Sequence, residues 1–165
     1  MIMKTAIIYS HSATKTKQAA KHIKEAFEKP IDDIDVDGLN PDDLKKYDLL
    51  ILGAPTWFDG ELPHYWDELV PAIEDLNLKK QKVAIFGNGD QVKYPENFGD
   101  AVGLLAEVFE SAGATTIGKT STEGYTFEAS KAIRDGEFAG LILDFENQSK
   151  LNKSRAKTWV EAINN

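Results

Sequence analysis

The chain has 165 residues, of which 42% are hydrophobic and 28% are charged, a size and balance typical of one globular domain. It contains no cysteine, which excludes disulfides, thiolate catalysis and cysteine-bound zinc or iron–sulfur sites. The net charge of −8 disfavours nucleic acid as a partner. The sequence contains no run of about 18 apolar residues, the length needed to span a membrane. We therefore expect a single cytoplasmic domain over residues 1–165.

Short apolar runs predict the buried strands of a parallel sheet. They are rich in Ile, Leu, Val and Ala without polar alternation, as strands covered on both faces are. In chain order they are Thr5–Tyr9, Leu49–Gly53, Val83–Phe86 and Leu141–Leu143. Ile31–Val36 mixes Ile with Asp, which is typical of an edge strand, and Thr115–Ile117 is a candidate sixth strand segment.

Helical periodicity separates these strands. Apolar residues recur at helical spacing from Ala19 to Phe27, from Phe98 to Ala112 and from Ala156 to Ile163. The alternation of strand and helix implies right-handed βαβ units and three layers, with helices on both faces of the sheet. The polar stretch Lys119–Gly140 interrupts this rhythm, and a segment of that length is either a functional loop or an unrecognised element.

Three loops follow predicted strands at the carboxyl edge of the sheet, where open parallel sheets bind ligands. The first, residues 10–16, offers hydroxyls and a helix amino terminus to a phosphate, although Ser and Thr are also ordinary helix caps. In the second, Trp57 brings a ring to this edge or packs on a neighbouring helix. In the third, Tyr94 brings another ring, and Asp90 accepts a ring N–H or caps a turn. Together they predict a planar, phosphorylated aromatic cofactor.

The second and third loops and the residues after them resemble long-chain flavodoxins. The likeness lies in Pro55-Thr56-Trp57, Gly60-Glu61-Leu62, Gly87, Gly89-Asp90-Gln91, Tyr94, Asn97-Phe98, Ser121-Thr122-Glu123-Gly124-Tyr125, Ser130-Lys131-Ala132, Arg134-Asp135-Gly136-Glu137-Phe138, Gly140-Leu141, Leu143-Asp144, Asn147-Gln148-Ser149 and Trp159-Val160. It covers the chain from Leu49 onward. The resemblance implies a flavodoxin-like, three-layer α/β sandwich whose five-stranded parallel sheet has the order 2-1-3-4-5, with the polar stretch as a long-chain insertion in the last strand. Flavodoxin is itself a standard example of that strand order and of a ligand at its switch point.

The resemblance also implies FMN as cofactor, with Trp57 and Tyr94 flanking its isoalloxazine ring. It places Asp90 and the backbone of residues 88–91 at the pyrimidine edge, and the Phe58-Asp59 peptide beside N5. No catalytic residue and no metal ligand is expected. The candidate cofactor-binding residues are Ser10, His11, Ser12, Ala13, Thr14, Lys15, Thr16, Pro55, Thr56, Trp57, Phe58, Asp59, Gly60, Asn88, Gly89, Asp90, Tyr94 and Asn97.

The first loop departs from the family pattern Thr/Ser-x-Thr-Gly-x-Thr. Counted back from Thr16, two hydroxyls are replaced, by His11 and Ala13, and Thr14 stands where the family has glycine. A slip of one residue would restore Ser10 and Ser12, but the glycine is lost in either alignment. A β-branched residue at positive φ would be strained, which would weaken phosphate binding. His11 either compensates as a donor or cation, or is an exposed residue without a role.

The resemblance implies a low-potential one-electron carrier, not a substrate-transforming enzyme, that shuttles electrons as a monomer between a flavodoxin-reductase type of partner and other redox enzymes. Residues 31–80 carry thirteen acids against four Lys, and this region is either a surface tuned for solubility or a docking face for basic partners. The alternative is a binding or regulatory module of the same fold that has weakened or lost FMN binding. A quinone-reducing flavoenzyme would need a nicotinamide site. A phospho-accepting receiver would need clustered Asp after the first strand, where the chain has Tyr9-Ser10-His11.

Overall fold

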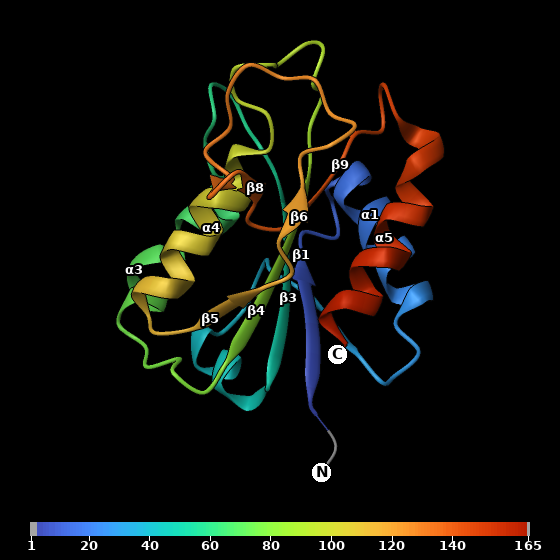
Figure 1. The fold of residues 1–165 in the computed structure, drawn as a ribbon. Helices are drawn as coiled ribbons and strands as arrows, with labels where there is room; N and C mark the ends of the chain where they lie inside the picture. Colours follow the sequence, from blue (N-terminus) through green and yellow to red (C-terminus); the bar gives the residue numbers. More distant parts are fainter. Residues whose placement is uncertain (1–2, 165) are drawn as a thin grey trace.

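A twisted parallel sheet forms the middle layer of the fold (Figure 1). The structure is a computed structural model that describes residues 3–164. The strands lie in the order β2-β1-β3-β4-β5. Their bounds are β1 Thr5–Tyr9, β2 Asp32–Asp35, β3 Leu49–Pro55, β4 Lys82–Asn88 and β5 Thr115–Ile117. The predicted fold class and strand order are therefore confirmed.

Two short strands share the fifth position of the sheet. β5 pairs with Lys82–Ala84 at the start of β4, and β9 (Leu141–Leu143) pairs with Phe86–Asn88 at its end. The chain can return so close to β4 because position 140 is glycine, where a Cβ atom would lie 2.0 Å from the carbonyl oxygen of Ile85. The last strand is thus split into two segments, with residues 118–140 between them.

Residues 118–140 contain secondary structure that the sequence pattern did not predict. They form a small antiparallel sheet in the order β6-β8-β7, built from β6 Thr120–Ser121, β7 Ile133–Arg134 and β8 Glu137–Phe138. Two-residue strands are too short to produce a detectable alternation. The segment interrupts the last strand at the expected place, and its assignment to the long-chain class stays a prediction.

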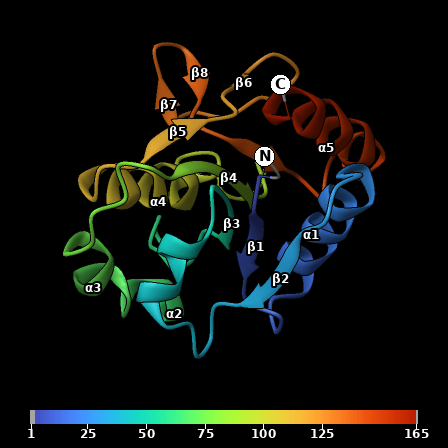
Figure 2. The same ribbon diagram turned by 90° about the horizontal axis from the view of Figure 1, so that it is seen from below.

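Helices cover both faces of the sheet, as Figures 1 and 2 show. α1 (Thr14–Ala26) and α5 (Ser149–Ile163) lie on one face, and α4 (Asp100–Ser111) lies on the other with the short helices α2 (His64–Asp67) and α3 (Val70–Glu74). The three longer helices were predicted. α2, α3 and the 3₁₀ helix Pro41–Lys46 were not, because each is too short for a periodic apolar stripe. None of the helices within residues 3–164 combines the length and apolarity needed to cross a bilayer.

Each helical layer encloses its own apolar core. Side chains alternate along a strand, so Ile7 and Ile51 face the α1–α5 side, whereas Ile8 and Leu52 face the α4 side. This two-sided burial explains the continuous apolar runs in the sequence. Because the strands are parallel, the loops after β1, β3 and β4 all emerge at one edge, the upper end of the molecule in Figure 1.

Candidate functional site

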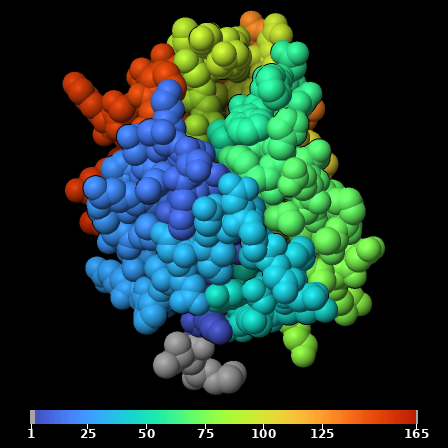
Figure 3. Space-filling model, turned by 180° about the vertical axis from the view of Figure 1, so that it is seen from behind, coloured from blue at the N-terminus to red at the C-terminus, as the bar shows by residue number. Residues whose placement is uncertain are grey.

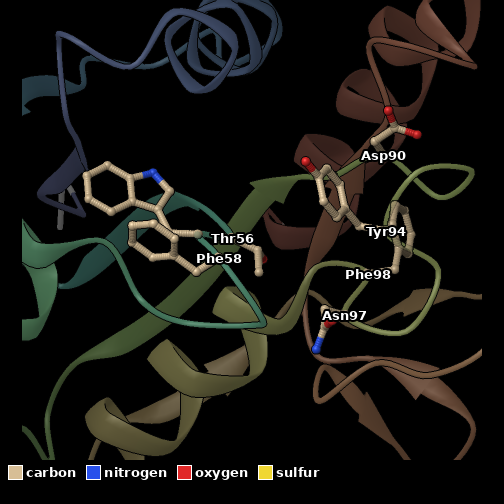
Figure 4. A pocket seen from close by; sticks show the side chains of 8 residues that line it. Thr56, Phe58, Asp90, Tyr94, Asn97 and Phe98 are labelled. Carbon is tan, nitrogen blue, oxygen red and sulfur yellow. The ribbon is translucent and has the colours of Figure 1, made fainter.

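A cavity of about 490 Å³ opens between the loops that follow β3 and β4. It is lined by Thr56, Trp57, Phe58, Gly89, Asp90, Tyr94, Asn97 and Phe98. Phe58 and Tyr94 lie on opposite sides of the space (Figure 4). These residues are 70% and 51% exposed, so their rings are available to a ligand rather than buried in the core. Aromatic groups on two sides are the arrangement that a flat ring requires.

The indole of Trp57 is braced by rings from the following turn and from α2. It meets Phe58, His64 and Tyr65 edge-on, with ring centroids 5.6 to 6.2 Å apart. Both interpretations of Trp57 therefore hold, because it packs against a neighbouring helix and also lines the cavity. The bracing fixes the orientation of the ring before any ligand binds.

Trp57 begins a tight hairpin. Its N–H donates to the carbonyl of Glu61 at 2.9 Å, and the N–H of Glu61 donates back at 2.7 Å. Inside the turn Phe58 has φ +50° and Gly60 has φ +95°. A left-handed conformation costs a non-glycine residue about 1–2 kcal/mol, so the turn is strained at Phe58. Asn97 holds the turn from the next loop by donating from Nδ2 to the carbonyl of Asp59 at 3.2 Å.

A second cavity, of about 510 Å³, lies over the loop after β1. It is lined by Ser10, Ser12, Ala13, Thr14, Lys15, Thr16, Asp37, Pro55, Trp57, Tyr65 and Asn88. Trp57 borders both cavities, which therefore adjoin at the indole. Each volume lies in the range of about 300–1,000 Å³ that is usual for cofactor sites. Seen from behind, the first part of the chain (blue) meets the segments that follow β3 (teal to green) and β4 (yellow-green) in the upper part of the molecule (Figure 3).

The loop after β1 presents a helix amino terminus without a side-chain cap. α1 starts at Thr14, and its N-cap residue is Ala13, so the helix-cap interpretation of the hydroxyls is wrong for this helix. The first N–H groups of an α-helix have no acceptor within the helix and favour an anion. Ser10 is buried and its Oγ accepts from the N–H of Ser12 at 3.3 Å, while Thr16 Oγ1 donates to Asn88 Oδ1 at 2.8 Å.

The expected strain at Thr14 is absent. Thr14 is the first residue of α1, and within residues 3–164 the non-glycine residues with positive φ are Phe58 and Asp135 alone. The prediction of strain in the first loop was therefore wrong. The loop reaches the helix without a left-handed residue at this position, so the missing glycine carries no backbone penalty.

His11 lies against β2 instead of lining either cavity. Its Nε2 is 2.7 Å from Oδ1 of Asp33, whose other oxygen accepts from the hydroxyl of Tyr9 at 2.9 Å and pairs with Lys24. Burial acts to raise the pKa of Asp33, but the bonds from Lys24, Tyr9 and His11 outweigh it and hold this pKa below its ordinary value. His11 thus ties the loop to the edge strand.

The carboxylate of Asp90 caps a turn. Its Oδ1 accepts from the backbone N–H groups of Val92 and Lys93 and from Nδ2 of Asn147, at 2.8 to 3.1 Å. Burial favours a higher pKa for Asp90, yet these bonds and the charge of Lys15 lower it overall. Lys15, which lines the second cavity, pairs with Glu146.

Asp144 is the buried centre that holds the loop after β4. It is fully buried and accepts from the backbone N–H groups of Gln91, Glu146 and Asn147 and from two side-chain amides. Gln91 is also buried, and its Oε1 accepts from the N–H of Thr126 at 2.6 Å. The loop that carries Tyr94 is therefore anchored to β9 and to the insertion.

Most of the predicted site residues line one of the two cavities, and His11, Asp59 and Gly60 line neither. Sequence reasoning missed Asp37, Tyr65 and Phe98. Asp37 follows β2 at the same edge of the sheet, so the strand-end rule applied to the edge strand would have found it. Burial and then the carboxylates of Asp37 and Asp35 raise the pKa of Tyr65 to about 12. Within residues 3–164 no group of His, Asp and Glu side chains is placed to hold a metal ion.

Comparison with known proteins assigns the family. The family model described as "Flavodoxin" matches residues 7–159. The chain is 41% identical over 162 residues to a flavodoxin of Synechococcus elongatus, covering 97% of this chain and 95% of that one, and 38% identical over 161 residues to flavodoxin 1 of Escherichia coli, covering 96% and 92%. A crystal structure of Fusobacterium nucleatum flavodoxin bound to flavin mononucleotide superposes with a TM-score of 0.93 at 26% identity, covering 99% of this chain and 98% of that one. The chain belongs to the flavodoxin family.

Proposed function

We propose that the chain binds FMN, with the isoalloxazine ring in the cavity that Trp57, Phe58 and Tyr94 border and the phosphate in the cavity over residues 10–16. The single observation that carries this proposal is the pair of adjoining cavities around Trp57, one bordered by aromatic rings and the other by a helix amino terminus. The residues present fit the group, because an apolar slot suits a flat ring and free N–H groups suit a phosphate. Bound FMN supplies one-electron chemistry.

The residues of the site bind and shield the cofactor and set its electrostatic surroundings. Trp57 and Tyr94 exclude water from the ring faces, and the N–H groups of Thr14 to Thr16 receive the phosphate. Asp37 and Asp90 border the cavities, and Asp59 lies in the adjacent turn. Nearby negative charges oppose the gain of another electron, and each ~1.4 kcal/mol of such repulsion lowers a one-electron potential by ~59 mV. This favours a low-potential carrier.

We further infer that the chain transfers electrons between partner proteins and does not transform a substrate. Residues 56–76 carry six acids and no Lys or Arg, and this surface adjoins the exposed ring of Phe58. Such a surface steers association with basic faces of a reductase or an electron acceptor. A cysteine-free chain has no need of an oxidising compartment, which supports a cytoplasmic carrier, and we infer that it acts as a monomer.

Titration of the apoprotein with FMN and with riboflavin tests the proposal. We expect FMN to bind at least tenfold more tightly, because riboflavin lacks the phosphate that the helix amino terminus holds. Flavin fluorescence gives both affinities. Equal affinities would show that the first loop does not hold a phosphate. Binding of neither compound would overturn the whole proposal and favour the alternative of a binding module without flavin.

A further inference from the structure

A groove of about 600 Å³ lies between α3 and α4, beside the hairpin but outside the two cofactor cavities. We call it the α3–α4 groove. Half-buried apolar side chains form part of its lining, namely Leu62, Val70, Leu104 and Val108. Gly60 and Glu61 also line it. The groove therefore begins where the hairpin that carries Trp57 ends.

Exposed carboxylates flank these apolar side chains on both sides. Glu61, Asp67 and Glu74 come from the hairpin, α2 and α3, and Glu107 comes from α4. Within residues 3–164, none of the four carboxylates takes part in an ion pair. His64 and Lys131 also line the groove, so its four acids outnumber its single Lys. Scattered acids on an acidic protein are ordinary solvated charges, but here unpaired acids line both sides of an apolar groove. Such a groove matches a ligand that is apolar along one side and positively charged at its margins.

Charge is separated between the two helical layers. α1 and α5 together carry seven Lys and one Arg against two Glu, whereas residues 56–76 and α4 carry nine acids and no Lys or Arg. Figure 2 shows these layers on opposite sides of the sheet. The field of such a molecule turns its negative side, and with it the α3–α4 groove, toward a positively charged partner.

We propose that the α3–α4 groove is the docking site for a basic amphipathic helix of a redox partner protein. A helix with apolar residues at positions i, i+3, i+4 and i+7 presents one apolar stripe, which covers the apolar lining, and its flanking Lys and Arg residues meet the carboxylates. This inference rests on the proposed electron-carrier function. A helix bound there contacts Glu61, which pairs with Trp57 across the hairpin, and so brings the partner next to the cofactor site.

The test uses the FMN-loaded protein and an 18-residue helical peptide of Leu and Lys with all Leu on one face. A control peptide has the same composition with Leu distributed around the helix. Fluorescence anisotropy at low salt measures both affinities. We expect the amphipathic peptide to bind at least tenfold more tightly than the control. Equal binding of the two peptides would overturn the proposal, because charge alone would then explain the attraction.

Two matched variants locate the binding site. Asp67→Lys with Glu107→Lys reverses two charges at the groove, and Asp42→Lys with Glu128→Lys reverses two exposed acids elsewhere. The net charge changes equally in both. We expect at least a tenfold loss of peptide affinity for the groove variant and less than a twofold loss for the other. Equal losses would overturn the proposal. Flavin absorbance of every variant separates this result from a failure to bind FMN, which would count against the proposed function instead.

Discussion

The loop that carries Tyr94 forms one wall of the site. Replacement of Asp144 by Asn tests whether this loop depends on a buried carboxylate. The two oxygens of Asp144 accept from Gln91 on one side and from Glu146 and Asn147 on the other, at 2.8 to 3.2 Å. Asn has the same shape but a single acceptor oxygen. In either orientation its NH₂ group faces N–H donors, so at least two donors lose their acceptor: the buried pair of Gln91, or the partly buried N–H groups of Glu146 and Asn147.

The expected loss of stability follows from the burial of these donors. A buried donor without a partner costs about 1–3 kcal/mol. We therefore expect the free energy of unfolding of the apoprotein to fall by about 2–4 kcal/mol in Asp144→Asn, measured by urea denaturation. FMN affinity should fall as well, by about tenfold or ~1.4 kcal/mol, because Asp90 and Tyr94 lie on the loosened loop.

Glu128→Gln is the matched control, since it removes one negative charge at an exposed side chain. An exposed substitution of this kind should change the unfolding free energy by less than about 0.5 kcal/mol. The reasoning is refuted if Asp144→Asn unfolds like the wild type. It is also refuted if stability falls while FMN affinity is unchanged, because the carboxylate would then not support the cofactor wall.

Three further predictions concern the ring wall, the acidic surface and the edge strand. Tyr94→Ala removes the proposed stacking interaction of about 0.5–1.5 kcal/mol, so the FMN dissociation constant measured by fluorescence should rise about two- to tenfold. Val92 is an exposed neighbour that lines neither cavity, so Val92→Ala should leave this constant unchanged. Lys in place of Asp59, Glu68 and Asp75 should slow electron transfer from a basic reductase at low salt, with a smaller difference at high salt; an unaltered rate at low salt would contradict steering. The folded-state pKa of Asp33 lies below its unfolded value, so its contribution to stability is present above about pH 4 and is lost as the pH falls through the folded pKa. Asp33→Asn should therefore melt at a lower temperature than the wild type at pH 7, and this difference in melting temperature should disappear in acid. A difference that persists in acid would exclude ionisation of Asp33 as its cause.

The sheet could be predicted from sequence because strands buried on both faces, such as Leu49–Pro55, are continuous runs of apolar residues. Short elements contain no such run. α2 has four residues and is anchored by Trp66, whose Nε1 donates to the carbonyl of Gly53 at 2.9 Å. β6 has two residues, and Thr120 within it donates to the carbonyl of Gly140 at 2.6 Å. These contacts join residues far apart in the chain, which local patterns do not encode.

Site residues could be predicted where their position after a strand alone determines where they lie. Trp57 and Tyr94 follow strands of one parallel sheet, so they had to emerge at one edge. The role of His11 was not predictable, because its partner Asp33 lies 22 residues away. The turn cap at Asp90 was one of its two predicted roles, because its partners Val92 and Lys93 are close in the chain, but its bond from Asn147, 57 residues away, was not predictable. Backbone conformation was misjudged for a similar reason. The left-handed residue is Phe58, where the hairpin fixes the turn, and not Thr14, which the start of α1 draws into the helical region.

The two walls of the proposed FMN slot are held by different kinds of contact. Trp57 is fixed within its own segment, by the hairpin to Glu61 and by rings no more than eight residues away. The Tyr94 wall depends on remote segments, since Pro95 accepts from the N–H groups of Glu128 and Ala129 at 2.8 and 3.0 Å. The insertion and the β9–α5 connection therefore support the Tyr94 wall, while the Trp57 wall is held by its own segment and by the bond from Asn97 to the carbonyl of Asp59. For this reason a change that breaks these backbone contacts or those of Asp144 should loosen the Tyr94 wall more than the Trp57 hairpin, whereas an exposed side-chain change such as Glu128→Gln should not.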